Sequence, residues 1–473
     1  MNVLLVRGKP TFMDMIVGIP IGLVYVAPIA ERRGHHVEIL DLALEEGDPE
    51  PVLESKLKER AWDLVGLSCM TAEYAGTEAV ARQVKAFDSG IRIIFGGQHP
   101  TMVVEEVLSQ PYCDFVCVGE GEEVFDRFLE AMESGGGFSE VPGLAFKEAA
   151  GELRRNPPCP SIQDVDAIPF PAYHLLDLDR YVEAKSARFT PKYRRSIQIF
   201  SSRGCPWHCT YCHDLFGKSF RPRSAENVLA EMKMLYYDYG IQEFMVEDDI
   251  FNFDMDRAKK ICDLIVEEGM EIGMQFGNGV RLERLDEELI QKMAAAGTHH
   301  ICIAIESASP RIQKLTKKYL KLHMVNDVVR WSKKHGIHIL GFFMIGFPTE
   351  TLEEINMTIR FASRTDLDEA LFSIVIPYAG TELSKQVVEL GMYDPTYQPD
   401  LLHEVVRVKT PDFDFKGLKR LQRKAYLMFF LTRFRFLKML PKLLDFRSAR
   451  RYINAIERHF LPEFLTGATS RTN

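Results

Sequence analysis

Three cysteines stand close together near the middle of the chain. The segment that begins at Ser201 reads Ser-Ser-Arg-Gly-Cys-Pro-Trp-His-Cys-Thr-Tyr-Cys-His-Asp, and its cysteines are Cys205, Cys209 and Cys212. Three thiolates with C-x3-C-x2-C spacing on a short loop can bind three irons of a cubane cluster, which leaves the fourth iron without a protein ligand. Iron-sulfur clusters require soft thiolate ligands. The motif therefore predicts a cluster with one open coordination site, where chemistry can take place.

A structural zinc site is the alternative for the same cysteines, with His208 or His213 as the fourth ligand. The spacing, the position directly after a strand-like segment and the pattern downstream favour the cluster. The chain has nine cysteines, an odd number, which argues against a disulfide framework. We expect the remaining six to be mostly core residues in apolar strands and helices: Cys69, Cys113, Cys117, Cys159, Cys262 and Cys302.

The elements that must position this motif follow from the apolar pattern. Strand-like segments alternate with helical patterns six times from Ser196 onward, and the cysteines follow the first of them. Six such units predict a partial parallel (β/α)6 barrel over residues 194–400. Its expected strands are 197–201, 244–246, 273–277, 301–305, 339–345 and 371–375.

An earlier alternation of strands and helices predicts a separate parallel sheet wrapped by helices. We therefore expect an α/β protein whose residues 1–140 form a doubly wound, Rossmann-like domain. The expected strands are 3–6, 36–40, 64–67, 92–95 and 115–118, with helices near 21–33 and 75–87. Ligands bind at the carboxyl ends of the strands in such sheets. The candidates there are Ser68, Gly96, Gly97, Gly119, Glu120 and Gly121, although tight turns also require glycine.

Two further segments differ in composition. Residues 141–193 lose the alternating pattern and contain several prolines, which predicts a linker. Residues 401–473 form the expected helical C-terminal region, in which Lys416–Arg458 holds thirteen basic residues and two acidic ones. Phe430, Phe434 and Phe436 lie among them. Rings and basic groups on one helix suit a membrane surface, and the alternative is that the rings pack beneath the barrel.

The overall composition excludes several classes of protein. The chain has 473 residues, of which 46% are hydrophobic and 26% charged, which argues against general disorder. Its net charge of -9 gives no reason to expect nucleic-acid binding. The longest uncharged run, Met15–Ala30, is too short and too interrupted by glycine and proline to span a membrane. We therefore expect a cytoplasmic protein.

The cysteine segment resembles the signature of radical S-adenosylmethionine (SAM) enzymes, in which SAM binds the open iron. The resemblance implies that Tyr211 lies near the adenine and that Cys205, Cys209 and Cys212 are the catalytic metal ligands. It also extends to residues after the later strands. Those expected to contact SAM are Glu247, Asp248, Asp249, Arg281, Glu306 and Ser307. The segment Gly341–Pro348 resembles the glycine-rich element of the family, and Pro377–Thr381 resembles a recurring motif after the sixth strand.

The order of a doubly wound domain, a proline-rich linker and a radical SAM barrel is similar to the cobalamin-dependent radical SAM enzymes. Their best-known members are methyltransferases and an anaerobic ring cyclase of bacteriochlorophyll synthesis. The resemblance implies that the glycine-bearing edge of the first sheet holds cobalamin. The D-x-H-x-x-G pattern that supplies a histidine to cobalt is absent, so we expect no histidine ligand from this motif. A degenerate domain without cofactor remains the alternative.

The resemblance implies a radical SAM methyltransferase with a 4Fe-4S cluster and cobalamin, acting on an unactivated carbon of a hydrophobic or natural-product substrate. A radical cyclase or oxidoreductase of the magnesium-protoporphyrin ester cyclase type is one alternative, and a non-enzymatic zinc-bound scaffold is another. The expected partners are a small-molecule or lipid-like substrate and an electron donor such as flavodoxin or ferredoxin. The basic C-terminal region adds peripheral contact with the inner membrane face.

Overall fold

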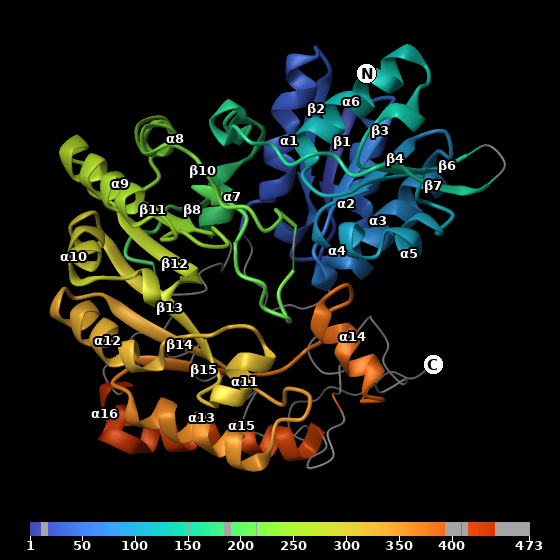
Figure 1. Ribbon diagram of the computed structural model, residues 1–473. Helices are drawn as coiled ribbons and strands as arrows, with labels where there is room; N and C mark the ends of the chain where they lie inside the picture. The colour runs from blue at the N-terminus through green and yellow to red at the C-terminus, as the bar shows by residue number, and fades with distance from the viewer. Residues whose placement is uncertain are drawn as a thin grey trace.

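The computed structural model describes residues 1–10, 18–148, 151–183, 191–213, 215–392, 408 and 415–439. Two parallel sheets, each covered by helices, lie in sequence along the chain (Figure 1). This is the α/β architecture that the sequence predicts, with a doubly wound domain first and a barrel-like domain second.

The first sheet has the strand order β2-β1-β3-β4-β5-β6-β7. Its first five strands are parallel and buried on both faces, as their continuous apolar runs require. The strands are β1 Asn2–Arg7, β2 His36–Asp41, β3 Leu64–Ser68, β4 Arg92–Gly96, β5 Phe115–Cys117, β6 Leu144–Lys147 and β7 Leu153–Arg155. The last two pair antiparallel, so the sheet continues into the segment that we predicted to be a linker. Their short strands carried no alternation strong enough to be recognised.

Helices cover both faces of this sheet, and each face has its own hydrophobic core. Helix α1 packs against α6 on one face, and α2 packs against α3 on the other. Because the chain crosses between faces beside β1, the carboxyl ends of β1 and β3 form the switch point of a doubly wound fold. The helices are α1 Ile21–Arg32, α2 Glu50–Lys58, α3 Tyr74–Phe87, α4 Gln98–Met102, α5 Val104–Leu108 and α6 Gly121–Ser134.

The second sheet contains six parallel strands in the order β15-β14-β13-β12-β11-β8. Strands β8 and β15 are its two edges, so the predicted barrel is open rather than closed (Figure 1). The strands are β8 Ser196–Ile199, β11 Glu243–Val246, β12 Gly273–Val280, β13 Thr298–Glu306, β14 His338–Ile345 and β15 Glu369–Ile374. Its helices are α8 Ala225–Tyr239, α9 Met255–Glu268, α10 Glu287–Ala295, α11 Pro310–Leu315, α12 Val325–Lys334, α13 Leu352–Arg364 and α14 Glu382–Glu389.

Between β8 and α8 the chain forms a short antiparallel ribbon of β9 (Ser202–Arg203) and β10 (Arg221–Pro222). The connection between the domains carries helix α7 (Leu178–Glu183).

The described part of the C-terminal region is helical, as predicted. Helix α15 (Phe415–Leu431) packs against α13 and β15, and α16 (Arg435–Met439) follows it. Phe429 is buried in the barrel core, Phe430 is half-buried against it, and Phe434 and Phe436 are exposed. Contact of the exposed rings with a membrane stays a prediction. Residues 401–407, 409–414 and 440–473 of the predicted region lie outside the described residues. Within the described part of the chain, no helix is long and apolar enough to cross a membrane.

Candidate active site

The three motif cysteines lie on a loop that we call the cluster loop, residues 204–220, which the β9–β10 ribbon closes at its base. Gly204 begins the loop with a φ of 78°, a conformation that favours glycine. A Cβ atom there would lie 2.2 Å from the carbonyl oxygen of Ser219. The backbone N–H of Cys205 donates to the carbonyl of Gly217 at 3.3 Å. The turn into the loop is therefore possible only with glycine at position 204.

The cysteines themselves carry free thiols. Cys205 and Cys209 are half-buried and Cys212 is exposed. The middle of the loop is fixed from outside, because Thr210 donates to the carbonyl of Thr316 at 3.1 Å and accepts from the N–H of Leu383 at 2.8 Å. Among the described residues, no group of three or more His, Cys, Asp or Glu is arranged to hold one metal ion. Three thiols on one short loop can each bind one iron of a cubane cluster.

Two of the three acidic residues after β11 contact the segment that leads into the cluster loop. Asp248 is 2% exposed and accepts hydrogen bonds from the backbone N–H of Ser201 at 2.6 Å and from the hydroxyls of Ser201 and Ser202. Asp249 accepts from the backbone N–H of Gly204, and burial raises its pKa. Glu247 pairs through its backbone with Ile199 of β8. Asp248 therefore holds the segment that leads into the cluster loop, and its contact with SAM stays a prediction.

Arg281, which follows β12, faces the cluster loop. Its guanidinium carbon lies 4.5 Å from the ring centre of Trp207, in a cation–π contact. Its Nε atom is 2.7 Å from the carboxylate of Glu283, and it donates to the carbonyl of Lys318 at 2.7 Å. The residue thus lies at the site, where it stacks on the loop in this structure.

Glu306, at the end of β13, receives a hydrogen bond from the hydroxyl of Tyr211 at 3.1 Å. Its φ of 64° is unusual for a residue with a side chain, and such strain is often concentrated at functional sites. Lys318 lies 3.6 Å from the same carboxylate oxygen. The Tyr211 ring is also 6.1 Å from that of Phe347. The predicted adenine, ribose and glycine-rich elements are therefore brought together.

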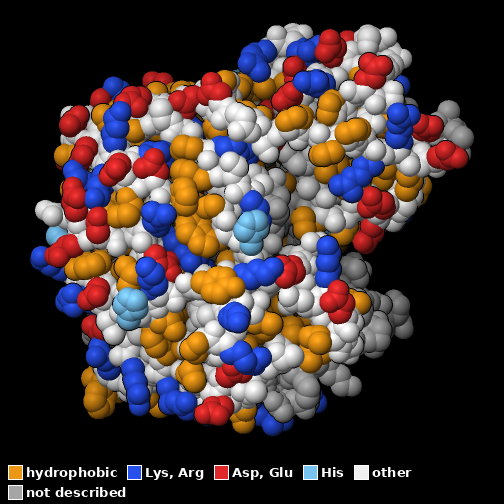
Figure 2. Space-filling model, viewed as in Figure 1, with side chains coloured by type: hydrophobic (Ala, Val, Ile, Leu, Met, Phe, Trp, Pro, Cys, Tyr) orange, Lys and Arg blue, Asp and Glu red, His pale blue; other side chains and the backbone are white. Residues whose placement is uncertain are grey.

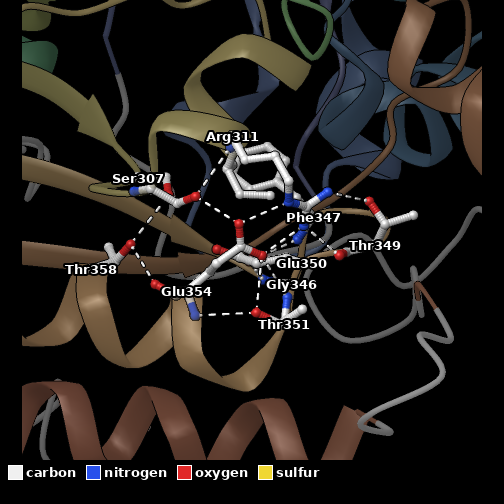
Figure 3. A network of polar contacts seen from close by, with 11 residues as sticks. Ser307, Arg311, Gly346, Phe347, Thr349, Glu350, Thr351, Glu354 and Thr358 are labelled. Carbon is white, nitrogen blue, oxygen red and sulfur yellow. Dashed lines mark hydrogen bonds and ion pairs between the residues drawn. The ribbon is translucent and has the colours of Figure 1, made fainter.

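The turn after β14 is held by a polar network that the sequence motifs did not reveal (Figure 3). Glu350 is 1% exposed and accepts from the backbone N–H groups of Gly346 and Phe347 at 2.7 and 3.1 Å. Burial raises its pKa to about 8. Arg311 pairs with Glu354 at 2.6 Å, and both side chains point toward this turn. The sequence carried one signal of this network, namely an acidic residue, Glu350, four residues after Gly346.

Ser307 is also part of this network. Its hydroxyl lies 3.2 Å from that of Thr358 on α13, and the Thr358 hydroxyl accepts from the N–H of Ala308. Ser309 donates to Glu354 at 2.7 Å. These contacts connect the chain after β13 to helix α13.

Glycine stands at several positions of the carboxyl edge of the first sheet, and the physical reason for it differs from one position to the next. Gly97 has a φ of 94°, and a Cβ there would lie 2.9 Å from the Ser68 hydroxyl oxygen, so it is needed for packing. Gly119 has a φ of 87° with open space around its missing side chain. Gly96 ends β4, and Gly121 packs against Val26. Gly119 is therefore the glycine of this edge that best fits the approach of a large cofactor.

Glu120 forms ion pairs with the barrel domain, and its predicted contact with cobalamin stays a prediction. Its carboxylate is buried and lies 3.0 Å from Arg203 and 2.5 Å from Arg221, both in the ribbon below the cluster loop. The two carboxyl edges also meet at a second point, where Gly380 after β15 lies against Met102 of α4. The edge predicted to bind cobalamin and the edge that carries the cluster loop therefore face each other.

Comparison with known proteins agrees with this arrangement. The B12 binding domain family matches residues 17–129, and the radical SAM superfamily matches residues 199–362. An uncharacterized methyltransferase of Pyrococcus horikoshii is 35% identical over 88% of both chains. Cytidylyl-2-hydroxyethylphosphonate methyltransferase of Streptomyces wedmorensis is 30% identical over 80% of this chain and 79% of its own.

More distant relatives extend the comparison. The anaerobic magnesium-protoporphyrin IX monomethyl ester cyclase of Rubrivivax gelatinosus is 24% identical over 84% of this chain and 71% of its own. The structure of TsrM, a radical SAM methyltransferase from Kitasatospora setae with cobalamin and a [4Fe-4S] cluster bound, superimposes with a TM-score of 0.66. It is 20% identical and covers 84% of this chain and 76% of its own.

Together these matches define an enzyme that combines a cobalamin-binding domain with a radical SAM domain. The chain belongs to the cobalamin-dependent radical SAM methyltransferase family. Its cofactors are accordingly cobalamin, SAM and a 4Fe-4S cluster. This membership decides against the non-enzymatic zinc scaffold.

Proposed function

We propose that this enzyme methylates an unactivated carbon of a hydrophobic or natural-product substrate, with its cluster on Cys205, Cys209 and Cys212. The observation that carries the proposal is the position of the cluster loop. It contacts the carboxyl ends of β11, β12, β13 and β14 through Asp249, Arg281, Glu306 and Phe347. When bound, the cluster with SAM supplies a radical that removes hydrogen from carbon, and cobalamin supplies the methyl group.

The residues of the chain bind, orient and enclose these groups. Tyr211 and Phe347 offer rings to the adenine, Glu306 and Lys318 offer polar partners to the ribose or carboxylate, and Asp249 lies where an amino group can be bound. The substrate enters between the two carboxyl edges, where the first domain excludes water from the barrel mouth. An electron donor such as flavodoxin or ferredoxin reduces the cluster.

The cluster ligands can be tested without knowledge of the substrate. Purified without oxygen, the wild-type protein should hold about four irons per chain and cleave SAM to 5'-deoxyadenosine under reduction. Cys209→Ala should lose both the iron and the cleavage. Cys159→Ala, a half-buried cysteine far from the motif in sequence, is the matched control and should retain both. Iron and cleavage that survive in Cys209→Ala would refute this ligand assignment.

A cyclase or oxidoreductase remains the second candidate, because a cyclase is among the relatives. SAM labelled with deuterium in its methyl group separates the two functions when extracts are searched by mass spectrometry. A methyltransferase transfers the labelled methyl group to its product, whereas a cyclase forms an unlabelled product. Labelled products that appear only with intact enzyme support methylation, and unlabelled ones alone support cyclisation.

We further propose that α15 and α16 attach the enzyme to an anionic membrane surface. Exposed apolar side chains occur on and between these helices: Leu427, Leu431, Phe434 and Leu437. Lys416, Arg420 and Lys424 are exposed on α15, and residues 415–439 contain no acidic residue. Basic and apolar side chains also occur together along the lower rim of the molecule in Figure 2. This combination of rings and positive charge suits an anionic lipid surface.

Flotation with vesicles tests this contact. The wild-type protein should float with vesicles that contain phosphatidylglycerol and not with neutral ones, and salt should weaken binding. The double variant Leu431→Gln and Phe434→Gln should lose most of the binding. Val266→Gln removes an equally exposed apolar side chain from α9 and should bind normally. Binding that ignores vesicle charge and salt would count against the proposal.

A further inference from the structure

Two arginines and two glutamates are buried together where the two domains meet beside the cluster loop. We call them the interdomain quartet: Arg203, Arg221, Glu120 and Glu122. Their side chains are between 3% and 8% exposed. Both arginines come from the β9–β10 ribbon, Glu120 comes from the turn between β5 and α6, and Glu122 comes from the first turn of α6. Charged side chains are rarely buried without a specific reason.

The contacts within the quartet are short and directional. Arg203 lies 3.0 Å from Glu120 and binds Glu122 through both terminal nitrogens, at 3.1 and 2.5 Å. Arg221 contacts Glu120 at 2.5 Å and donates to the carbonyl of Phe216 at 2.7 Å. Burial alone would raise the pKa of Glu122, but the nearby charge of Arg203 outweighs burial, and the pKa of Glu122 is lowered. Two guanidinium groups thus face two carboxylates within the quartet.

The positive charges of the β9–β10 ribbon are balanced by carboxylates of the first domain. Arg221 and Arg203 are register partners, so two positive charges stand directly opposite each other across the ribbon. Such a pair is unfavourable by itself. The two carboxylates that compensate it come from residues about 80 to 100 positions earlier in the chain. The base of the cluster loop thus takes its charge partners from the cobalamin-binding domain.

Each side of the quartet is adjacent to a cofactor site. Arg203 is followed by Gly204 and Cys205, the first cluster cysteine. Glu120 directly follows Gly119, the open glycine at the cobalamin edge. Buried ion pairs add little net stability, because the cost of desolvation offsets their attraction. What the paired guanidinium and carboxylate groups provide is a defined relative orientation.

We propose that the interdomain quartet consists of positioning residues that hold the cluster loop in register with the cobalamin-binding edge. The inference rests on the proposed function, because it concerns two reactions of SAM. Reductive cleavage of SAM needs only the barrel domain. Transfer of the SAM methyl group to cobalamin needs both domains in register. Loss of the quartet should therefore separate the two reactions.

The separation can be measured without the natural substrate. The double variant Glu120→Gln and Glu122→Gln keeps the shape of both side chains and removes their charges. With titanium citrate as reductant, cleavage of SAM yields 5'-deoxyadenosine, and methyl transfer to added cobalamin yields S-adenosylhomocysteine. We expect the variant to keep its iron and cobalamin and to form 5'-deoxyadenosine within about twofold of wild type. Formation of S-adenosylhomocysteine should fall about tenfold or more.

Glu123→Gln is the matched control, because Glu123 lies on the same helix and its 2.5 Å ion pair with Arg127 is exposed. It should behave like wild type in both assays. Arg221→Lys keeps the positive charge but replaces the planar guanidinium group. If the glutamate variant does not accumulate, Arg221→Lys should lose S-adenosylhomocysteine formation and keep 5'-deoxyadenosine formation in the same way. An unchanged ratio of the two products, or an equal fall in both, would overturn the positioning role.

Hydrogen exchange of the cofactor-free protein gives a readout that does not depend on the chemistry. The double variant should exchange faster than wild type and Glu123→Gln in residues 204–213 and 115–122, and not in the rest of the barrel. Unchanged exchange there would also count against the proposal. A wild-type enzyme that forms neither SAM product would refute the proposed function, while the exchange measurement would still test the contact.

Discussion

At the scale of single residues, the site contains two glutamates, one buried and one half-buried, whose pKa values are shifted in opposite directions. Glu350 and Glu354 lie in one network, four residues apart (Figure 3). Burial raises the pKa of Glu350 to about 8, because only two backbone N–H groups face its carboxylate directly. Hydrogen bonds from Arg311, outweighing a smaller effect of burial, lower the pKa of Glu354 to about 2. The turn after β14 therefore holds one neutral and one ionised glutamate at neutral pH.

This difference predicts how stability depends on pH. In the unfolded chain a glutamate has a pKa of about 4.3, so the native state holds an extra proton on Glu350 between that value and about 8. The stabilisation is complete at low pH and is lost as pH rises through this window, by on the order of a few kcal/mol. Glu350→Gln should flatten the decline between pH 5.5 and 8.5, measured by denaturant unfolding of wild type and variant.

Glu354→Gln provides the control for this prediction. Because its pKa is lowered, the stability from Glu354 is present above the unfolded pKa and disappears only as pH falls below about 4. Its substitution should lower stability equally at each pH of the window and leave the slope as in wild type. If Glu350→Gln and wild type show the same slope, Glu350 is ionised in the folded protein and the prediction is wrong.

At the scale of elements, α15 closes an open edge of the barrel sheet. β15 is an edge strand, and its residue Phe372 would expose unpaired backbone groups there. Gln422 donates to the Phe372 carbonyl at 2.7 Å, and the Tyr426 hydroxyl accepts from the Phe372 N–H at 3.2 Å. Their spacing of four residues places both on one helix face. The C-terminal helix is therefore part of the barrel domain, whatever its outer face binds.

Arg435, which lies shortly after the C-terminal end of α15, connects this part of the chain to the barrel domain by hydrogen bonds. It is 5% exposed and donates to the carbonyls of Phe429 at 2.7 Å and Ser363 at 3.2 Å, and also to that of Thr365. Arg435→Met should destabilise the protein by about 2–4 kcal/mol, since three buried carbonyls lose a charged donor. The measurement is denaturant unfolding, with hydrogen exchange of residues 415–439 to locate the effect.

The neighbouring Arg433 is the matched comparison. It is half exposed and forms an exposed ion pair with Asp366 at 2.7 Å. Such pairs contribute about 0–1 kcal/mol, so Arg433→Met should change stability by less than about 1 kcal/mol. Equal effects of the two substitutions would show that burial of Arg435 does not matter.

At the scale of the whole molecule, the segment between the domains is bound to both of them. Tyr181 donates to Asp41 of the first domain at 2.6 Å, and Tyr173 donates to Glu231 of the barrel domain at 2.6 Å. Both tyrosines are buried. With the interdomain quartet, these contacts fix the relative position of the two carboxyl edges. We therefore expect cobalamin held at the carboxyl edge of the first domain to face the barrel mouth.

The same arrangement predicts the state of the bound cobalt. His99 is the histidine nearest the carboxyl edge among the described residues of the first domain, and it is 6% exposed with its ring 4.2 Å from that of Tyr74. Burial lowers the pKa of His99 to about 4. The imidazole is therefore neutral at neutral pH, but it is buried within the first domain. We expect the protein to retain cobalamin without a histidine ligand.

Electron paramagnetic resonance tests this expectation. Protein labelled with 15N-histidine and reconstituted with cobalamin in the cobalt(II) state should give the same nitrogen hyperfine pattern as unlabelled protein. His99→Gln should also leave the pattern unchanged. A splitting that changes upon labelling would show histidine on cobalt, and failure to retain cobalamin would favour a degenerate domain.

The sequence by itself determined the features that depend on local order. The alternation of apolar segments predicted both parallel sheets, because strands and helices differ in periodicity. The spacing of the motif cysteines predicted the cluster loop after the first barrel strand, because all three cysteines lie within one short segment of the chain. The resemblance of these motifs also indicated the family.

The tertiary structure decided which side chains meet. Glu120 follows a strand in the sequence, and docking of the domains places it between two arginines of the barrel. The pairing of β11 with β8 turns Asp248 toward Ser201. The contacts of these two residues with cobalamin and SAM stay predictions. Glu350 carried no recognised signal. A buried charge needs a partner, and partners are chosen by strand order and domain docking, which bring distant residues together.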